Sequence, residues 1–177
     1  ARVLAAVYGH TFDPVVYTQG VPISGRLRLA ELDPEAGNPA QEITELLREF
    51  TDQSSPVFGQ GFGPAALASV VWGNELASAT GDRRYANLIV AAADRYQSGA
   101  PGEAPPPSDP EFRTEDMFMN GAVLGRAYRR TGEVRYLELL TRFLLDGNIQ
   151  QAHGLFWHSR SATYFWGRSN GFAALGL

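Results

Sequence analysis

Residue types that carry much of protein chemistry are missing from this chain of 177 residues. Cysteine is absent, which excludes disulfide bonds, thiolate zinc sites and cysteine nucleophiles. Lysine is absent too, so all 15 basic side chains are arginines and no catalytic or phosphate-binding lysine exists. The three histidines, His10, His153 and His158, form no HExxH-like ligand pair. We therefore expect neither a metal site nor a cofactor.

Positive charge and long apolar runs are also scarce. The net charge is −4 and no block of basic residues runs along the chain, which argues against a nucleic-acid partner. No apolar run approaches the roughly 18 residues of a membrane span, so no membrane partner is expected. The first residues do not read as a signal peptide. The cytoplasm is the expected location, and secretion after removal of a signal peptide is the alternative.

A helical period dominates the sequence from Ala40 onward. Ile43, Leu46, Leu47 and Phe50 follow the spacing of one helix face. Segments 9–39 and 147–165 lack such a period, and the proline-rich segment 98–110 cannot lie inside a helix. The pattern predicts helices over about 40–50, 64–79, 83–96, 115–129 and 133–146, and one starting near Asn170. We therefore expect a single all-α domain over residues 1–177 with about six helices.

One motif occurs twice. Leu76 to Leu88 and Leu124 to Leu139 each contain a helix end, a Thr-Gly-acid turn and then an Arg-Tyr pair that opens the next helix. The glycine suits the left-handed end of a helix, and the acid suits the start of the following one. A helical hairpin repeated at a spacing of roughly 50 residues favours a helical array or toroid. An ordinary bundle with two similar turns is the alternative.

Asp116 is the first candidate for chemistry. It opens an otherwise apolar segment in which no charge follows until Arg126. A helix that is apolar on most sides is buried on most sides, so Asp116 is predicted at the edge of a dry layer. Burial raises the pKa of a carboxyl group and keeps it protonated, as a general acid requires. The competing interpretation is that Glu115 and Asp116 are first-turn acids that complement the helix dipole.

A second candidate region combines aromatic rings with one histidine and one arginine. It contains Gly154-Leu-Phe-Trp-His158 and Trp166-Gly-Arg-Ser-Asn-Gly-Phe172. Aromatic faces stack on sugar rings, and an arginine binds a carboxylate through two hydrogen bonds, so the set suits a sugar acid. Glycine beside polar groups lets the backbone approach a ligand. Alternatively, the rings fill the core under a loop and Arg168 pairs with an acid.

Together these motifs resemble the unsaturated glucuronyl and rhamnogalacturonyl hydrolases, glycoside hydrolase families 88 and 105. The likeness rests on Asp116-Met-Phe-Met119, the Thr-Gly-Glu-Val-Arg-Tyr turn and the two aromatic motifs, and it covers residues 57–177 best. It implies an (α/α)6 toroid. A complete toroid needs about twelve helices and on the order of 350 residues. We therefore expect about half of one here, incomplete at the C-terminus, which self-association or a missing C-terminal half would complete.

The resemblance also implies an activity. Such enzymes remove an unsaturated uronic acid from the non-reducing end of oligosaccharides by hydrating its C4=C5 enol ether, which makes a pectin-derived oligosaccharide the expected partner. By resemblance, Asp116 protonates C4, His158 and Trp166 line the sugar, and Arg168 meets its carboxylate. Gly167 and Asn170 complete the binding set. No metal or cofactor is implied.

The sequence departs from the family at one instructive place. Relatives carry a second Asp where the helix near Pro64 begins, and Gly61 and Gly63 stand there in this chain. Three interpretations therefore stay open. The first is the hydrolase, the second is another toroid enzyme such as an epimerase or a lyase, and the third is a catalytically inactive carbohydrate-binding or scaffold module of the same fold.

Overall fold

The computed structural model describes residues 1–12, 16–52 and 63–177. Within these ranges the protein is all-helical, as the sequence predicts, and an isolated bridge between Gln150 and Phe156 stands in place of any strand. The glycine-rich stretch before Gly63 lies outside the described residues. Among the described residues, no helix combines the length and apolar character needed to cross a membrane. The chain divides into two compact units, Ala1–Phe62 with Ala66–Ala92, and Gly63–Ala65 with Ala93–Leu177.

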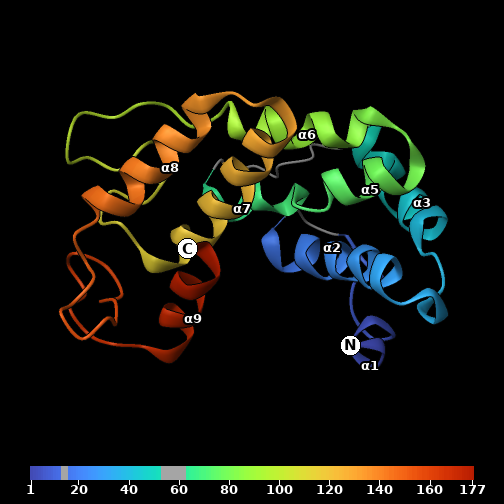
Figure 1. The fold of residues 1–177 in the computed structure, drawn as a ribbon, viewed down its shortest axis with the longest axis horizontal. Helices are drawn as coiled ribbons and strands as arrows, with labels where there is room; N and C mark the ends of the chain where they lie inside the picture. The colour runs from blue at the N-terminus through green and yellow to red at the C-terminus, as the bar shows by residue number, and fades with distance from the viewer. Residues whose placement is uncertain (13–15, 53–62) are drawn as a thin grey trace. The chain divides into compact units, whose positions relative to one another are not determined.

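The first unit contains most of the N-terminal helices (Figure 1). They are α1 (Arg2–Ala5), α2 (Tyr17–Leu32), α3 (Ala40–Thr51), α5 (Gly73–Thr80) and α6 (Arg83–Ala93), with short 3-10 turns at Pro34–Ala36 and Ala68–Val70. The short helix α4 (Pro64–Leu67) spans the boundary between the units. Trp72, fully buried, makes edge-to-face contacts with Phe12 and Tyr85 at ring-centroid distances of 5.9 and 6.2 Å. These rings anchor the core of this unit.

Two expectations about this unit are wrong. Segment 9–39 was expected to lack a helix, yet α2 occupies its centre although it contains Gly20, Pro22 and Gly25. Tertiary packing overrides the weak local pattern: Ile23 and Leu27 are buried one turn apart, and at Gly20 any side chain would collide with the backbone of Ser69. The single helix expected over 64–79 is instead broken into α4, a 3-10 turn and α5.

The break in 64–79 has a simple reason. Every residue from Leu67 to Trp72 is buried, so the apolar pattern in this stretch has no one-sided period that would distinguish a helix from tight turns. The extra helix and the broken one together give more helices than the six expected.

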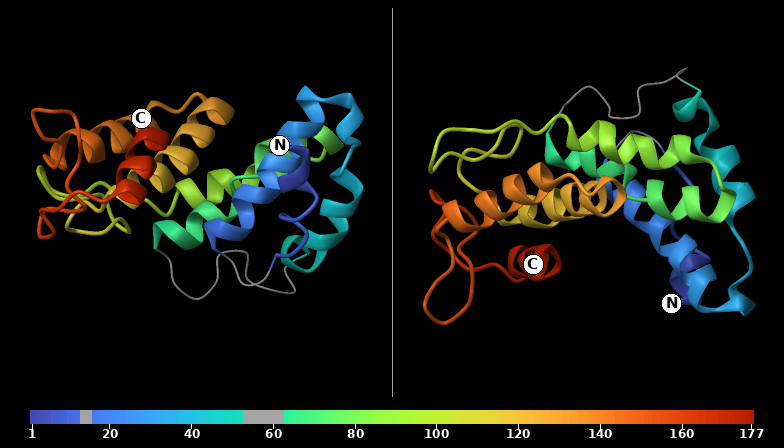
Figure 2. Two further views of the ribbon diagram at one scale, coloured as in Figure 1. Left: turned by 90° about the horizontal axis from the view of Figure 1, so that it is seen from below. Right: turned by 45° about the horizontal axis from the view of Figure 1, so that its top comes forward.

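The second unit contains α7 (Thr114–Thr131), α8 (Val134–Asp146) and α9 (Gly167–Gly176), close to their predicted positions. Figure 1 and Figure 2 show α7 packed against both α8 and α9. A Cβ atom added to Gly121 of α7 would lie 2.9 Å from the carbonyl oxygen of Gly176 in α9. The two helices therefore approach at backbone contact, which only glycine permits. Segment 147–165 is irregular, as predicted.

The repeated turn has the same geometry in both copies. Gly81 and Gly132 end their helices in the left-handed region, with φ of 76° and 75°. In each copy the threonine hydroxyl donates to the carbonyl four residues earlier and accepts from the backbone N–H of the acid. These distances are 2.7 and 3.2 Å at Thr80 and 2.9 and 3.1 Å at Thr131. One copy lies in each unit.

Candidate functional site

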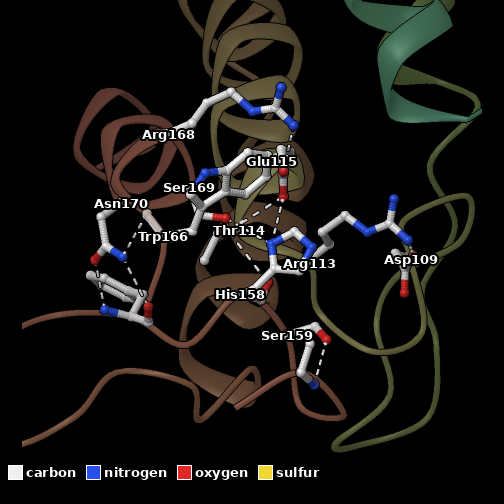
Figure 3. Close-up of polar contacts among 12 residues, drawn as sticks. Asp109, Arg113, Thr114, Glu115, His158, Ser159, Trp166, Arg168, Ser169 and Asn170 are labelled. Carbon is white, nitrogen blue, oxygen red and sulfur yellow. Dashed lines mark hydrogen bonds and ion pairs between the residues drawn. The ribbon is translucent and has the colours of Figure 1, made fainter. Parts of the chain in front are cut away.

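The polar residues of the second aromatic region gather where α7 and α9 both begin (Figure 3). We call this group the His158 cluster. It consists of Thr114, Glu115, His158, Trp166, Arg168 and Ser169. The backbone holds it together, because the Thr114 N–H donates to the carbonyl oxygen of His158 at 3.0 Å. The start of α7 is thereby tied to the irregular segment that carries His158.

Asn170 ties the same segment to α9. Its side-chain oxygen accepts from the Phe156 N–H at 2.8 Å, and its side-chain nitrogen donates to the Phe156 carbonyl at 3.0 Å. The nitrogen also lies 3.2 Å from the carbonyl oxygen of Trp166. A carboxamide matches a peptide group in this way because it carries one acceptor and two donors. Asn170 therefore supports the loop that carries His158.

His158 is the centre of the cluster. Its Nδ1 lies 2.7 Å from the Ser169 hydroxyl and 3.4 Å from the Glu115 carboxylate. Its ring stacks on Tyr164 at 5.4 Å between centroids and meets Trp166 edge-on at 5.7 Å. The Ser169 hydroxyl is fully buried and also accepts a hydrogen bond from the Thr114 hydroxyl at 2.6 Å. Polar bonds on one side and aromatic rings on the other thus fix the imidazole.

Arg168 lies over the indole of Trp166, with the guanidinium carbon 3.8 Å from the ring centroid. In Figure 3 Glu115 lies between Arg168 and His158. The distance from Arg168 to the Glu115 carboxylate is 3.9 Å, and the arginine side chain is 63% exposed. A loose pair of this kind leaves most of the guanidinium donors accessible to an anion. Exposed rings at Tyr164 and Trp166 flank it.

Asp116 has different surroundings, although it is next to Glu115 in the chain. Its carboxylate accepts the Asp109 backbone N–H at 2.7 Å, and the residue is only 6% exposed. Burial raises the pKa of this carboxyl to about 6. The hydrogen bond from Asp109 and the charge of Arg113 oppose that rise, whereas the negative charges of Asp109 and Glu115 add to it.

Buried polar atoms without partners occur on the same side of α7. Neither the hydroxyl of Tyr96 nor the side-chain oxygen of Asn120 forms a hydrogen bond with any of the described residues. Burial, and then the charge of Asp116, raises the pKa of Tyr96 well above its usual value. Asn120 lies one turn after Asp116 and donates to the Ser108 hydroxyl at 2.9 Å. Each such unpaired group costs about 1–3 kcal/mol of stability. Buried groups left unpaired in this way are typical of sites that bind water or a polar ligand.

The structure brings three of the predicted site residues together at Trp166, whose ring contacts both His158 and Arg168. Gly167 is the first residue of α9 and Asn170 braces the loop. Within the described ranges, no hydrogen bond or ion pair joins Asp116 to any of these five. Successive helix residues are rotated by about 100°, so Thr114 and Asp116 point to nearly opposite sides of α7.

Sequence reasoning missed the residues that complete the cluster. The sequence indicates Glu115 only as a first-turn acid, and it indicates no role for Thr114 or Ser169. The available signal was position: Glu115 precedes Asp116 on the helix, and Ser169 stands inside the Trp-Gly-Arg-Ser-Asn-Gly motif. Neither feature indicates a partner more than 40 residues away in the sequence.

The apolar cavity of the second unit, about 330 Å³, lies elsewhere. Its lining includes Phe143 and Leu144 of α8, Gly147 and Ile149. The His158 cluster is thus a surface platform and does not line this cavity. In the described part of the chain, no three His, Asp or Glu side chains come together in a way that could hold a metal ion. No protein-family model, curated protein or solved structure matches this chain.

Proposed function

We propose that this protein is a glycoside hydrolase of the unsaturated uronyl type, built on part of an (α/α)6 toroid. The substrate is an oligosaccharide, derived from rhamnogalacturonan, with a 4-deoxy-Δ4,5 uronic acid at its non-reducing end. The observation that carries the proposal is the buried carboxyl of Asp116, whose pKa is raised to about 6. A much larger share of it is therefore protonated near neutral pH than of an ordinary aspartate, and proton donation to carbon requires the protonated form.

The sugar acid would bind through the His158 cluster. Trp166 and Tyr164 supply exposed aromatic faces for the ring, and Arg168 supplies donors for the carboxylate. The repeated hairpin with matching turns supports the toroid, because such folds are built from repeated helical hairpins.

In the proposed reaction, Asp116 gives its proton to C4 of the enol ether. Positive charge develops at C5 and is shared with the ring oxygen. Water then forms the C5–O bond and loses one proton, which restores the Asp116 carboxyl group, and the resulting hemiketal opens and releases the neighbouring sugar. The carboxylate of Asp116 is stabilised meanwhile by the Asp109 N–H.

The first test is turnover of an unsaturated rhamnogalacturonan disaccharide, followed as loss of the ultraviolet absorbance of its conjugated double bond. We expect the wild-type chain to consume it and Asp116→Asn to lower the rate by roughly a hundredfold or more. Asp94→Asn is the matched control, because Asp94 pairs with Arg135 and Tyr136 away from the cluster. Unchanged turnover in Asp116→Asn would refute the assigned role.

A carbohydrate-binding module that does not turn over its ligand is the second candidate. It is favoured by the way Asp116 holds the proline-rich loop through Asp109 and faces away from His158. This candidate predicts binding of the disaccharide with its absorbance intact, loss of that binding in Arg168→Gln, and unchanged binding in Asp116→Asn. Equilibrium binding measured beside the absorbance assay separates the two functions.

A further inference from the structure

The polar groups around Asp116 come from two segments that meet on one face of α7. Asn120 follows Asp116 by four residues, so the two side chains are neighbours on the helix surface. The proline-rich loop contacts both of them. Its Asp109 N–H donates to Oδ2 of Asp116 at 2.7 Å, and its Ser108 hydroxyl accepts from the side chain of Asn120 at 2.9 Å.

Tyr96 joins these groups from the segment after α6. The backbone N–H of its neighbour Gln97 donates to the carbonyl oxygen of Pro106, in the same proline-rich loop, at 2.8 Å. The charge of Asp116 also acts on the Tyr96 hydroxyl. Three residues of the second unit, Tyr96, Asn120 and Asp116, therefore border one polar site, which we call the Tyr96 site.

Each member of the Tyr96 site has an oxygen atom that forms no hydrogen bond with any described residue. These atoms are the Tyr96 hydroxyl, Oδ1 of Asn120 and Oδ1 of Asp116, since the Asp109 N–H contacts only Oδ2. Tyr96 and Asn120 are 4% and 1% exposed, so bulk solvent does not hydrate them. A polar atom that loses its hydration without gaining a partner is strongly destabilising, so an empty site is unfavourable.

The chemistry of these three atoms identifies the missing partner. A carboxylate or carboxamide oxygen only accepts hydrogen bonds, whereas a tyrosine hydroxyl can donate one. Burial raises the pKa of Tyr96 well above its usual value, so this hydroxyl keeps its proton and remains a donor. The partner must therefore accept one hydrogen bond and donate two. A water molecule does this, and buried waters typically bond to about three otherwise unpaired groups.

Water also suits both protonation states of Asp116. When the carboxyl group is ionised, the water donates to its Oδ1. When the group is protonated, its O–H donates to the water, which keeps its bonds to Tyr96 and Asn120. A backbone N–H or carbonyl in the same place would match only one of the two states, because each has a fixed role as donor or acceptor.

We propose that one water molecule is bound between Tyr96, Asn120 and Asp116, and that it reverses its hydrogen bond with the Asp116 carboxyl when that group gains or loses a proton. Tyr96 and Asn120 are positioning residues, which act on the carboxyl group through this water. The inference goes beyond the proposed function and does not depend on it, because a hydrolase and a binding module would hold the water alike.

Oxygen-17 magnetic relaxation dispersion of the solvent tests the site, because it counts water molecules that stay in a protein for longer than its rotation. The double variant Tyr96→Phe with Asn120→Leu leaves one partner, and a buried water needs at least two. We expect its signal to fall by the amplitude of one water. Tyr136→Phe is the matched control, since the buried Tyr136 pairs with Asp94 at 2.8 Å and its loss should leave the amplitude unchanged. An unchanged amplitude in the double variant, or the same fall in the control, would overturn the proposal.

A carbon-13 NMR titration of Asp116 tests the coupling to its proton. The double variant removes a donor to the carboxylate, so the pKa of Asp116 should rise above about 6 by roughly one further unit. Tyr136→Phe should leave it unchanged. A pKa that stays constant in the double variant, or that falls toward 3.8 as the site opens to solvent, would overturn the coupling.

The wild-type protein provides a test that needs no substitution and that remains available if the double variant does not fold. A bound water should transfer magnetisation directly to the ring protons of Tyr96 in a nuclear Overhauser experiment. The absence of this transfer would overturn the water site. None of these results bears on the turnover of the unsaturated disaccharide, so the proposed function stands or fails separately.

Discussion

Glu115 and Asp116 are adjacent carboxyl groups with opposite surroundings. Asp116 faces the proline-rich loop, is 6% exposed and has its pKa raised by burial. Glu115 faces His158 and Arg168, where a negative charge has favourable partners. Two carboxyl groups separated in this way by their environments are suited to different tasks in proton transfer. Rotation about the helix axis, and not sequence distance, separates them.

The raised pKa of Asp116 predicts a pH dependence of stability. The folded protein holds this proton up to about pH 6, whereas an unfolded chain releases it near the ordinary value of 3.8. Between these values the folded state binds more protons, so this residue's contribution to the free energy of unfolding falls as pH rises. The loss by pH 8 is on the order of 3 kcal/mol. Asp116→Asn keeps an acceptor for the Asp109 N–H and has no such titration.

Urea unfolding of the wild type and Asp116→Asn at pH 4 and pH 8 checks this expectation. The variant should gain stability relative to the wild type at pH 8 and show little difference at pH 4. Comparing the two proteins at each pH cancels the opposite contributions of Asp33, Glu42 and Asp82, whose pKa values are lowered by their arginine partners. An equal difference at both pH values would contradict the burial of this charge.

The sequence predicts the buried state of Asp116 but not the His158 cluster. The long interval without charge after Asp116 is a local pattern, and it correctly indicates a dry helix face. The partners of Glu115 are His158 and Arg168, which come from a segment with no regular period. Only the packing of α9 against α7 brings these groups together, so no local pattern could indicate the contact.

Close packing of α7 and α9 makes a matched pair of glycine substitutions informative. Gly121→Ala would place its Cβ 2.9 Å from a backbone oxygen of Gly176, whereas Gly125→Ala on the same helix meets no atom within 4 Å. We expect Gly121→Ala to lower the free energy of unfolding by about 1–3 kcal/mol. Gly125→Ala should raise it by about 0.5–1 kcal/mol through the better helix propensity of alanine.

Thermal or urea unfolding of the two variants measures both effects. Since each substitution adds one methyl group within α7, their difference isolates the contact with α9. Equal stability of the two proteins would show that the helices do not approach closely in solution.

Helices with one apolar face were predictable, and those without one were not. α7 and α8 lie within about two residues of their expected bounds. α2 was missed because its glycines and proline disfavour a helix in isolation and its stability comes from packing on other elements. The all-α class could be predicted because most segments of the sequence show the apolar spacing of one helix face. The toroid itself remains a prediction.

The two Thr-Gly-acid turns, one in each unit, predict additive effects. A Cβ at Gly81 or Gly132 would meet no atom within 4 Å, so alanine acts only through the left-handed backbone. Each substitution should lower the free energy of unfolding by about 1 kcal/mol. The double variant should match the sum within about 0.5 kcal/mol, because the two positions share no partner. Urea unfolding of the four proteins checks this, and a larger deviation would mean that the turns are energetically coupled.

The distribution of tryptophan gives each unit its own optical signal. Trp72 is completely buried in the first unit, while Trp157 and Trp166 lie partly exposed in the second. Indole emission moves to longer wavelength as its surroundings become more polar. Blue-side fluorescence therefore reports on the core of the first unit. Red-side fluorescence reports on the surface at Trp166. There the stacked guanidinium of Arg168 and the edge-on imidazole of His158 make the emission of the indole sensitive to a bound ligand.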